Sequence, residues 1–321
     1  MLFEIAAILT GFVLLVWAAD RFVAGAAALA HLLGASTLLI GLTVVAVGTS
    51  APEIFVSISA ALNGNSGIAV GNALGSNITN IALVLGTTAM LSPLVAGSGI
   101  LRREIPVVLG IGLLAWWLCS DDVLDRLDGS LLLGGTLLLI GWLAWIARNP
   151  AASQDPLLAE LTAERPASMS GGRAAFWLLL GGVLLPLSSQ ILVWGAVGTA
   201  ERLGVSDLVI GLTIVAIGTS LPELAASISG ALKGEADLAI GNVLGSNMFN
   251  LLIVLGIPGL LAPGALPEGA LQRDFPVMIL LTVALFLMCM SRSGQARINR
   301  VEAGLLLTAF VAYEATLYYT A

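Results

Sequence analysis

The sequence predicts an all-α membrane protein with ten transmembrane helices, arranged as two inverted-topology repeats of five. Composition gives the first indication: 58% of the 321 residues are hydrophobic and only 10% are charged, which is far from the usage of soluble domains. The second indication is that apolar stretches of roughly 20 residues, long enough to cross a bilayer as a helix, recur along the whole chain. The third is an internal repeat of the sequence.

Ten apolar segments are expected to form the helices. The first begins with "MLFEIAAILT", which carries Glu4 and lacks the basic start of a secretory signal peptide, so we expect it to be retained as a membrane helix. The ten segments cover approximately residues 3–30, 37–62, 67–91, 104–120, 127–147, 172–200, 207–232, 237–261, 274–290 and 301–320.

The second half of the chain repeats the first. "GLTVVAVGTSAPE", which ends at Glu53, matches "GLTIVAIGTSLPE", which ends at Glu223, and at the same offset "GNALGSNITN" matches "GNVLGSNMFN". Each half therefore holds five predicted helices. Because five is an odd number, the second half must enter the membrane upside down relative to the first, which is the expected architecture of a secondary transporter with its site near the midplane.

The predicted organisation is a first repeat over residues 1–148, a linker over 149–171 and a second, inverted repeat over 172–321. The linker is the one polar stretch of any length and is rich in proline, serine and charge. If the N-terminus is outside, nine basic residues fall in cytoplasmic loops and three in outer loops, as the positive-inside rule requires. We therefore expect a multi-pass protein of the plasma (inner) membrane, with both termini extracytoplasmic and the linker cytoplasmic.

Each repeat places a proline and a glutamate inside an apolar segment. Pro52 of "GTSAPE" lacks an N–H and crowds the carbonyl four residues earlier, so it should free backbone oxygens near Gly48 and Thr49. Pro222 of "GTSLPE" should do the same in the second repeat. Freed carbonyls are tolerated at membrane depth only where they are buried in protein or line a cavity. Side-chain oxygens crowd the same two segments, from Thr49, Ser50, Glu53, Thr219, Ser220 and Glu223.

A second polar stripe follows on the next predicted helix of each repeat. Its members are four residues apart, so successive side chains drift by only about 40° and share one helix face. The stripes consist of Asn72, Ser76 and Asn80 in the first repeat and Asn242, Ser246 and Asn250 in the second. Glycines beside them, which allow helices to approach closely, are Gly71, Gly75, Gly241 and Gly245.

Together these motifs offer a site made only of oxygen ligands, with no histidine and no cysteine. Hard cations such as Ca²⁺ and Na⁺ choose such ligands, whereas Zn²⁺ and copper prefer nitrogen or sulfur. Two buried glutamates need a counter-charge, which one Ca²⁺, two Na⁺ or two protons would each supply. Because these cations would compete for the same oxygens, the pattern favours exchange of one set for the other.

At these residues the chain resembles the sodium/calcium exchanger family of the calcium/cation antiporter superfamily, in its compact prokaryotic form. "GTSAPE" with "GNALGSNITN" and "GTSLPE" with "GNVLGSNMFN" are similar to the two alpha repeats of that family. The resemblance implies that Glu53 and Glu223 are central carboxylates shared by Ca²⁺ and Na⁺. The further ligands that it implies are the hydroxyls of Ser76, Ser246, Thr49, Ser50, Thr219 and Ser220, the backbone carbonyls of Ala46 and Ala216, and the flanking amides of Asn80 and Asn250.

The resemblance implies a secondary active antiporter that exchanges Ca²⁺ for Na⁺ by alternating access, in which the first and sixth helices slide against the rest. Relatives that co-transport K⁺ carry aspartate at the position of Asn250, so the asparagine disfavours K⁺ co-transport here. Proton-coupled relatives show a "GNAxE"-like motif in place of "GTSxPE", and the chain lacks it. Ca²⁺/H⁺ antiport nevertheless stays open as the alternative function.

Two other classes of protein are weighed against an antiporter. A passive cation channel would use the same oxygens and differs only in lacking obligatory exchange. An intramembrane hydrolase would need a base beside Ser50 or Ser76, and the single histidine, His31, is predicted near a helix end. We therefore expect a transporter rather than an enzyme, with Ca²⁺ and Na⁺ as substrates, the lipid bilayer around it, and no cofactor, nucleic acid or protein partner.

Overall fold

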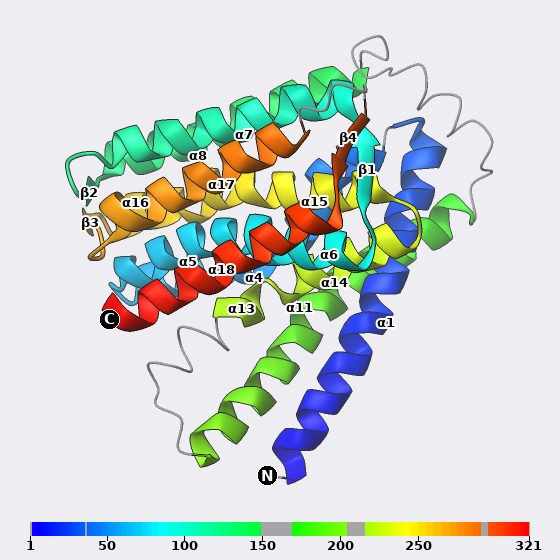
Figure 1. Ribbon diagram of the computed structural model, residues 1–321, viewed down its shortest axis with the longest axis horizontal. Helices are drawn as coiled ribbons and strands as arrows, with labels where there is room; N and C mark the ends of the chain where they lie inside the picture. Colours follow the sequence, from blue (N-terminus) through cyan, green and yellow to red (C-terminus); the bar gives the residue numbers. More distant parts are fainter. Residues whose placement is uncertain (1, 36, 149–168, 204–215, 290–294, 321) are drawn as a thin grey trace.

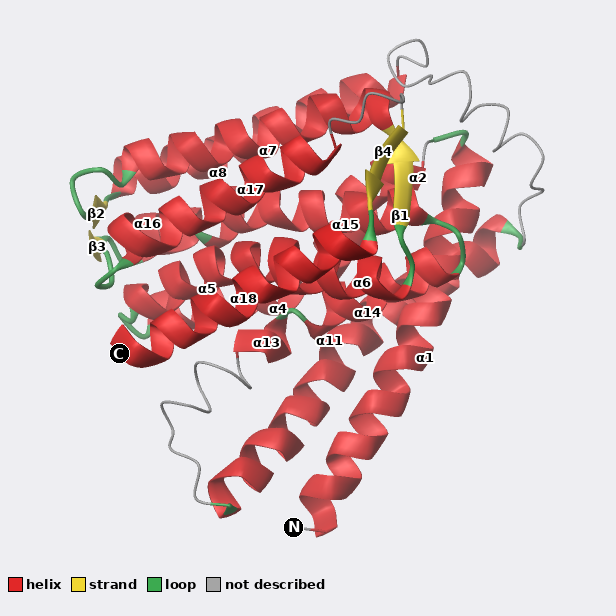
Figure 2. Ribbon diagram, viewed as in Figure 1, coloured by secondary structure: helices red, strands yellow, loops and turns green. Residues whose placement is uncertain are grey.

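The protein is predominantly helical, and most of its helices run between two ends of the molecule, while the two longest are steeply inclined to them (Figures 1 and 2). The structure is a computed structural model that describes residues 2–35, 37–148, 169–203, 216–289 and 295–320. The predicted linker falls almost entirely outside the described residues, and so does the first part of the predicted helix over 207–232. The linker and the start of that helix therefore remain predictions from the sequence.

The first half contains the expected helices, and its second helix is broken. The elements are α1 (Leu2–Leu33), α2 (Thr37–Ile40), η1 (Gly41–Val45), α3 (Ala46–Thr49), α4 (Ala51–Leu62), α5 (Ser66–Thr79), η2 (Asn80–Leu85), α6 (Gly86–Leu91), α7 (Ser98–Leu118) and α8 (Arg126–Arg148). The segments labelled η are π-helical turns. The predicted single helix over 37–62 bends by 51° where α3 meets α4, because Ser50 leaves helical geometry and Pro52 begins the next helix.

The described part of the second half repeats this order. Its elements are α11 (Gly171–Arg202), α13 (Ala216–Thr219), α14 (Leu221–Leu232), α15 (Ala236–Phe249), η4 (Asn250–Val254), α16 (Gly256–Leu261), η5 (Ala270–Asp274), α17 (Phe275–Cys289) and α18 (Arg300–Thr320). The π-helical turns η2 and η4 begin at the repeat-matched residues Asn80 and Asn250. Such turns are rare and occur frequently at functional sites.

Two short antiparallel strand pairs join the halves, which an all-α expectation did not include. β1 (Leu94–Gly97) pairs with β4 (Gln295–Ile298), and β2 (Val123–Leu124) pairs with β3 (Gly264–Ala265). The two pairs lie at opposite ends of the helical bundle (Figure 1). β1 follows the third helix of the first half, and its partner β4 precedes the fifth helix of the second half. β3 follows the third helix of the second half, and its partner β2 precedes the fifth helix of the first half. Strands of two to four residues carry no local sequence signal of their own, since their partners are more than a hundred residues away.

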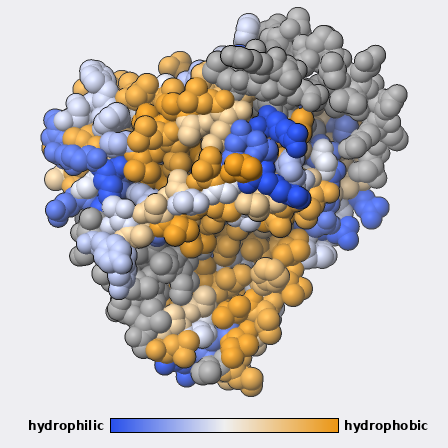
Figure 3. Space-filling view, in the orientation of Figure 1, coloured by the Kyte–Doolittle hydropathy of each residue, from blue (hydrophilic) through white to orange (hydrophobic). Residues whose placement is uncertain are grey.

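The described residues contain seven helices that are long and apolar enough to cross a membrane, or eight if the bent segment over 41–62 counts as one span. The surface agrees with a membrane environment. Hydrophobic side chains cover most of the face in Figure 3, and hydrophilic ones gather over the β1–β4 pair and toward the end that holds β2 and β3. The chain is therefore a multi-spanning membrane protein.

The two helices that carry the Ser/Asn stripes form the centre of the bundle. In the apolar windows of the spans 66–91 and 236–261, 72% and 94% of residues are buried, compared with 28% for α1 and 22% for α11. A helix that is apolar all round and buried lies in the core, whereas α1 and α11 expose most of their surface to lipid. The stripes are thus held where water is least accessible.

α1 and α11 lie side by side and contact each other closely through glycines (Figure 1). A Cβ added at Gly195 would lie 2.6 Å from the backbone oxygen of Glu4, and one at Gly181 would lie 2.6 Å from Cβ of Phe22. Gly25 likewise faces the backbone of α11. Gly182 and Gly198 also face side chains of α1. α1 and α11 therefore approach each other closely at these glycines.

Candidate ion-binding site

The repeated motifs produce the same backbone break in both halves. Ser50 has φ −81° and ψ 6°, and Ser220 has φ −88° and ψ 6°. Pro52 and Pro222 each lie in the first turn of the helix that follows. Because Pro222 has no N–H, the Gly218 carbonyl lacks its usual helical donor, and it accepts a hydrogen bond of 2.6 Å from Ser189 Oγ of α11. The predicted freeing of a carbonyl thus occurs in the second repeat.

Each break brings its glutamate into the interior. Glu53 is 1% exposed and Glu223 is fully buried. Ser50 Oγ donates to Glu223 Oε1 at 3.0 Å, and Ser246 Oγ donates to the same oxygen at 3.4 Å. A side chain of the first repeat therefore binds the carboxylate of the second.

The second carboxylate oxygens have no protein partner. Oε2 of Glu53 and Oε2 of Glu223 are buried and make no hydrogen bond with the described residues. The ion pairs found among the described residues involve other acids, such as Asp20, Glu104 and Asp274. Two buried carboxyl groups without a basic neighbour are costly unless a cation or a proton neutralises them.

Asn72 and Asn242 fix the two breaks onto the central helices. Asn72 Nδ2 donates to the backbone oxygen of Glu53 at 3.1 Å, and Asn242 Nδ2 donates to that of Glu223 at 3.3 Å. The two bonds are exact repeat equivalents. Asn242 also accepts from Thr49 Oγ1 through Oδ1 at 2.9 Å, so this amide ties the break of the first repeat to the central helix of the second.

Several other predicted residues also lie at this centre. Ser76 is buried, and Ser220 Oγ is buried without a partner in the described part of the chain. Thr219 lies on the wall of a cavity. The Ala46 carbonyl is occupied, since it accepts from the backbone N–H of Ser50 at 2.9 Å. Ala216 begins α13 next to the stretch that is not described.

The asparagines reveal two residues that the sequence analysis did not select. Asn80 Nδ2 donates to Oδ1 of Asn247 at 3.0 Å, and both residues are buried. Asn77 and Asn250 are buried as well. The repeated "GSN" contained the signal, because Asn77 and Asn247 occupy matched positions, but the four-residue spacing used to define the stripes omits them.

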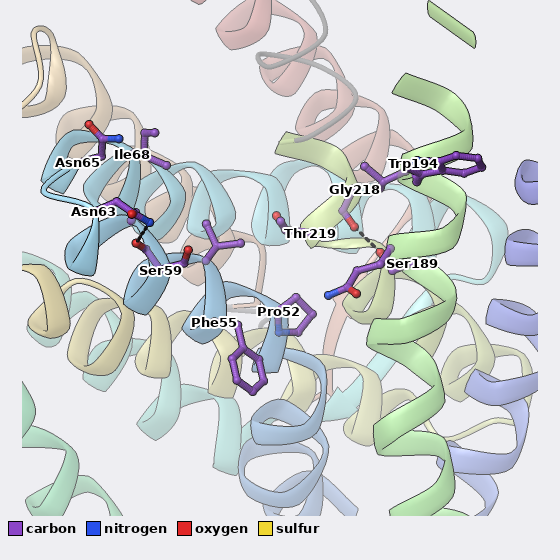
Figure 4. Close-up of a pocket in the computed structure, with 14 residues that line it drawn as sticks. Pro52, Phe55, Ser59, Asn63, Asn65, Ile68, Ser189, Trp194, Gly218 and Thr219 are labelled. Carbon is purple, nitrogen blue, oxygen red and sulfur yellow. Dashed lines mark hydrogen bonds between the residues drawn. The ribbon is translucent and has the colours of Figure 1, made fainter. Parts of the chain in front are cut away.

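A cavity lies between α4 and α11 and borders the breaks of both repeats at Pro52 and Thr219. It has a volume of about 630 Å³ and is open to the surface. Asn63 and Asn65 lie at one end, while Pro52, Gly218 and Thr219 lie deeper (Figure 4). Ser189 and Trp194 of α11 form the facing wall (Figure 4). The cavity thus borders the break of the second repeat at Gly218 and Thr219.

The chemistry of the centre suits a hard cation. The described residues contain no group of three histidines, cysteines or acidic side chains that would bind a transition metal. The buried groups that converge here are instead carboxylates, hydroxyls, amides and backbone carbonyls, which are the ligands of Ca²⁺ and of similar hard cations. His31 lies in the last turn of α1, and the Ser50 hydroxyl donates its hydrogen bond to Glu223.

Comparison with known proteins agrees with this chemistry. The family described as "Sodium/calcium exchanger protein" matches residues 3–147 and 173–319. The chain belongs to the sodium/calcium exchanger family. A solved structure of the sodium-calcium exchanger NCX_Mj is 30% identical, superposes with a TM-score of 0.82 and covers 98% of each chain.

Two further proteins are similar to this chain over nearly their whole lengths. CaxA of Alkalimonas amylolytica is 51% identical over 97% of both chains. The inner membrane protein YrbG of Escherichia coli (strain K12) is 40% identical over 99% of this chain and 98% of its own. The resemblance recognised from the alpha-repeat motifs is thus confirmed: the chain is a membrane antiporter of the compact exchanger type, and its relatives are transporters rather than enzymes.

Proposed function

We propose that the protein exchanges Ca²⁺ for Na⁺ across the membrane, with Glu53 and Glu223 as carboxylates shared by the competing cations. The observation that carries this proposal is the pair of buried carboxylate oxygens without protein partners. One Ca²⁺ or two Na⁺ would neutralise both charges, and an all-oxygen cluster suits either ion. Because the two sets of ions would need the same oxygens, binding of one excludes the other.

In this proposal the remaining oxygens complete the coordination. Ser50 and Ser246 already converge on Glu223, so their hydroxyls would lie beside any ion bound there. Thr49 contacts the stripe of the second repeat at two residues, Asn242 and Ser246. Ser76, Thr219, Ser220, Asn80 and Asn250 would serve the other positions, with Ala216 and the second lone pair of the Ala46 carbonyl as backbone ligands.

We also propose the ten-helix inverted-repeat architecture, with repeats over 1–148 and 172–321 joined by a linker over 149–171. Three repeat-matched features support it: the breaks at Ser50 and Ser220, the bonds of Asn72 and Asn242 to the glutamate backbones, and the strand pairs at opposite ends. An inverted repeat places equivalent segments at opposite membrane faces. With both termini extracytoplasmic in the inner membrane, the cavity at Asn63 would open outward.

Coupling to Na⁺ is tested by flux in sealed vesicles. When purified protein is reconstituted and an outward Na⁺ gradient is imposed in the presence of a protonophore, we expect uptake of radioactive Ca²⁺ well above that of protein-free vesicles. The protonophore removes any proton gradient, so only Na⁺ can drive this uptake. Equal internal and external Na⁺ serves as the control and should give uptake near background.

The same vesicles separate the alternatives. Uptake that follows a pH gradient and ignores Na⁺ would identify Ca²⁺/H⁺ antiport, in which protons neutralise the two glutamates. Uptake that continues with neither gradient, and that carries net Ca²⁺ current without a counter-ion, would identify a channel. Either result would contradict the proposal.

An ion pair holds one side of the proposed pathway closed. Lys233 Nζ, at the end of α14, lies 2.6 Å from Oδ1 of Asp20 in α1 and 2.9 Å from the Asp20 backbone oxygen. Both residues line a groove of about 540 Å³ between α1, α11 and α14. Their repeat equivalents, Asn63 and Gln190, line the open cavity and carry no charge. The pair would therefore favour the state that is open at Asn63.

Removing this pair should shift access away from the cavity. We expect Lys233→Met to slow labelling of a Ser59→Cys reporter by an impermeant thiol reagent, by up to about fivefold, because an exposed ion pair contributes about 0–1 kcal/mol. The native cysteines, Cys119 and Cys289, are buried and give little background. The charge swap Asp20→Lys/Lys233→Asp should restore the labelling rate. A labelling rate that Lys233→Met leaves unchanged would remove this role from the pair.

A further inference from the structure

The four buried asparagines form a polar cluster, here named the amide cluster, between the two central helices. Its members are Asn77, Asn80, Asn247 and Asn250, each at most 1% exposed. Asn80 Nδ2 bonds to Asn247 Oδ1 at 3.0 Å. The remaining six side-chain N and O atoms of the cluster have no partner among the described residues. Buried amide groups left without partners are destabilising, so a group of this size needs an explanation.

The cluster surrounds the start of both π-helical turns. Asn80 begins η2 and Asn250 begins η4, while Asn77 and Asn247 lie one turn earlier on α5 and α15. α5 packs against η4, and α15 packs against η2. The terminal asparagine of the first repeat, Asn80, bonds to the "GSN" asparagine of the second, Asn247. The residue before Asn247 in α15, Ser246, donates to Glu223.

The Asn80–Asn247 bond restricts what the Asn80 amide can do. A side-chain amide is planar, and its nitrogen and oxygen are joined to one carbon. When Nδ2 is held by Asn247, rotation about the last side-chain bond is fixed, and Oδ1 is fixed on the other side. That oxygen is buried and accepts no hydrogen bond from the described residues. It is thus an acceptor held in place without a donor, which is the arrangement a cation ligand requires.

We propose that Asn247 is a positioning residue that orients the Asn80 carbonyl oxygen toward the bound cation. Asn247 itself would touch no ion. The inference rests on the proposed function, because it needs Asn80 as a ligand. It differs from a packing role, in which the Asn80–Asn247 bond would stabilise the contact between α5 and α15 without affecting affinity for Ca²⁺.

A double-mutant cycle on the full-length reconstituted protein tests this role. We expect Asn247→Leu to raise the KM for Ca²⁺ by about tenfold with kcat within about twofold, since one oriented ligand is lost while the conformational steps remain. Asn80→Ala should raise KM at least as much. In the Asn80→Ala background, Asn247→Leu should have almost no further effect on KM, because residues that act through one contact are not additive.

Two further variants protect the test against misfolding. Asn247→Asp keeps an acceptor for Asn80 Nδ2, so its KM should stay at or below that of the wild type even if the leucine variant is poorly folded. Thr136→Val removes another buried hydroxyl without a partner among the described residues, in α8 rather than in either central helix, and should leave KM unchanged. Thermal stability in detergent, with and without Ca²⁺, is measured for every variant.

Each outcome has a distinct meaning. Multiplicative effects of Asn80→Ala and Asn247→Leu on KM, or an equal loss of affinity in Asn247→Asp and Asn247→Leu, would overturn the positioning role while leaving Ca²⁺ exchange intact. A loss of thermal stability in Asn247→Leu with an unchanged KM would identify packing instead. If the wild type moves no Ca²⁺ in exchange for Na⁺, the proposed function fails, and this inference fails with it.

Discussion

Replacing Glu53 by glutamine is expected to lower Na⁺-driven Ca²⁺ uptake by about 100-fold to 1000-fold. The substitution preserves the shape of the side chain and removes its charge. A divalent cation would then face a single buried carboxylate and remain partly uncompensated. Removing one partner of a buried charge pair costs about 3–5 kcal/mol, and each 1.4 kcal/mol is a factor of about ten in affinity. Glu223→Gln should have an effect of the same order, since the two positions are repeat equivalents.

The measurement is initial Ca²⁺ uptake in vesicles, together with calorimetric Ca²⁺ binding in detergent. Glu314→Gln supplies the matched control, because Glu314 is a partly buried glutamate of α18 that lies outside the site. We expect that variant to transport at nearly the wild-type rate. If Glu53→Gln binds Ca²⁺ as tightly as the wild type, the two carboxylates are not the ion ligands. A loss of transport in Glu314→Gln equal to that of Glu53→Gln would point to folding rather than coordination.

Replacing Gly245 by alanine is expected to destabilise the centre of the protein by about 2–3 kcal/mol. A Cβ at this position of α15 would lie 2.4 Å from the backbone oxygen of Leu42 and 2.7 Å from Cβ of Ala46. Backbone atoms cannot rotate away as a flexible side chain does, so α15 must move off η1 and α3. Overpacking of a well-packed interior costs about 1–3 kcal/mol, and the displacement would also move Ser246 and Asn242.

Thermal unfolding in detergent, followed by size-exclusion fluorescence, measures this effect. Gly110→Ala is the control, because Gly110 is exposed on α7 and an added Cβ would meet nothing within 4 Å. Alanine favours a helix over glycine by about 1 kcal/mol, so that variant should be as stable as the wild type or slightly more so. A Gly245→Ala protein with unchanged thermal stability would show that the contact between α15 and α3 yields easily.

The sequence pointed to one candidate centre because the same motif occurs twice. One intramembrane glutamate is ambiguous, but Glu53 and Glu223 at matched positions, each followed by a Ser/Asn stripe, indicated one shared cluster. The structure places both in the interior, with Ser50 bonded to Glu223. Periodicity was equally informative for the helices, since spans of about 20 apolar residues need no tertiary information.

Other features depend on contacts between distant segments and have no local signature. The bond from Ser189 to the freed Gly218 carbonyl joins two separate helices, and the Asn80–Asn247 bond joins the two halves. The strand pairs β1–β4 and β2–β3 likewise require both halves to be folded together. The exact position of the break at Ser50 was also missed, because proline limits where a helix can continue without fixing the residue at which it bends.

The two strand pairs have a mechanical consequence. Each pair joins the first half to the second, and the two pairs lie at opposite ends of the bundle, so the halves are linked on both sides of the ion centre. Neither pair includes α1 or α11, which contact each other through glycines. We therefore expect any change of access to involve movement of α1 and α11 relative to the helices that the strand pairs join. Such a movement would change the side to which the ion centre opens with little displacement of the ligands themselves.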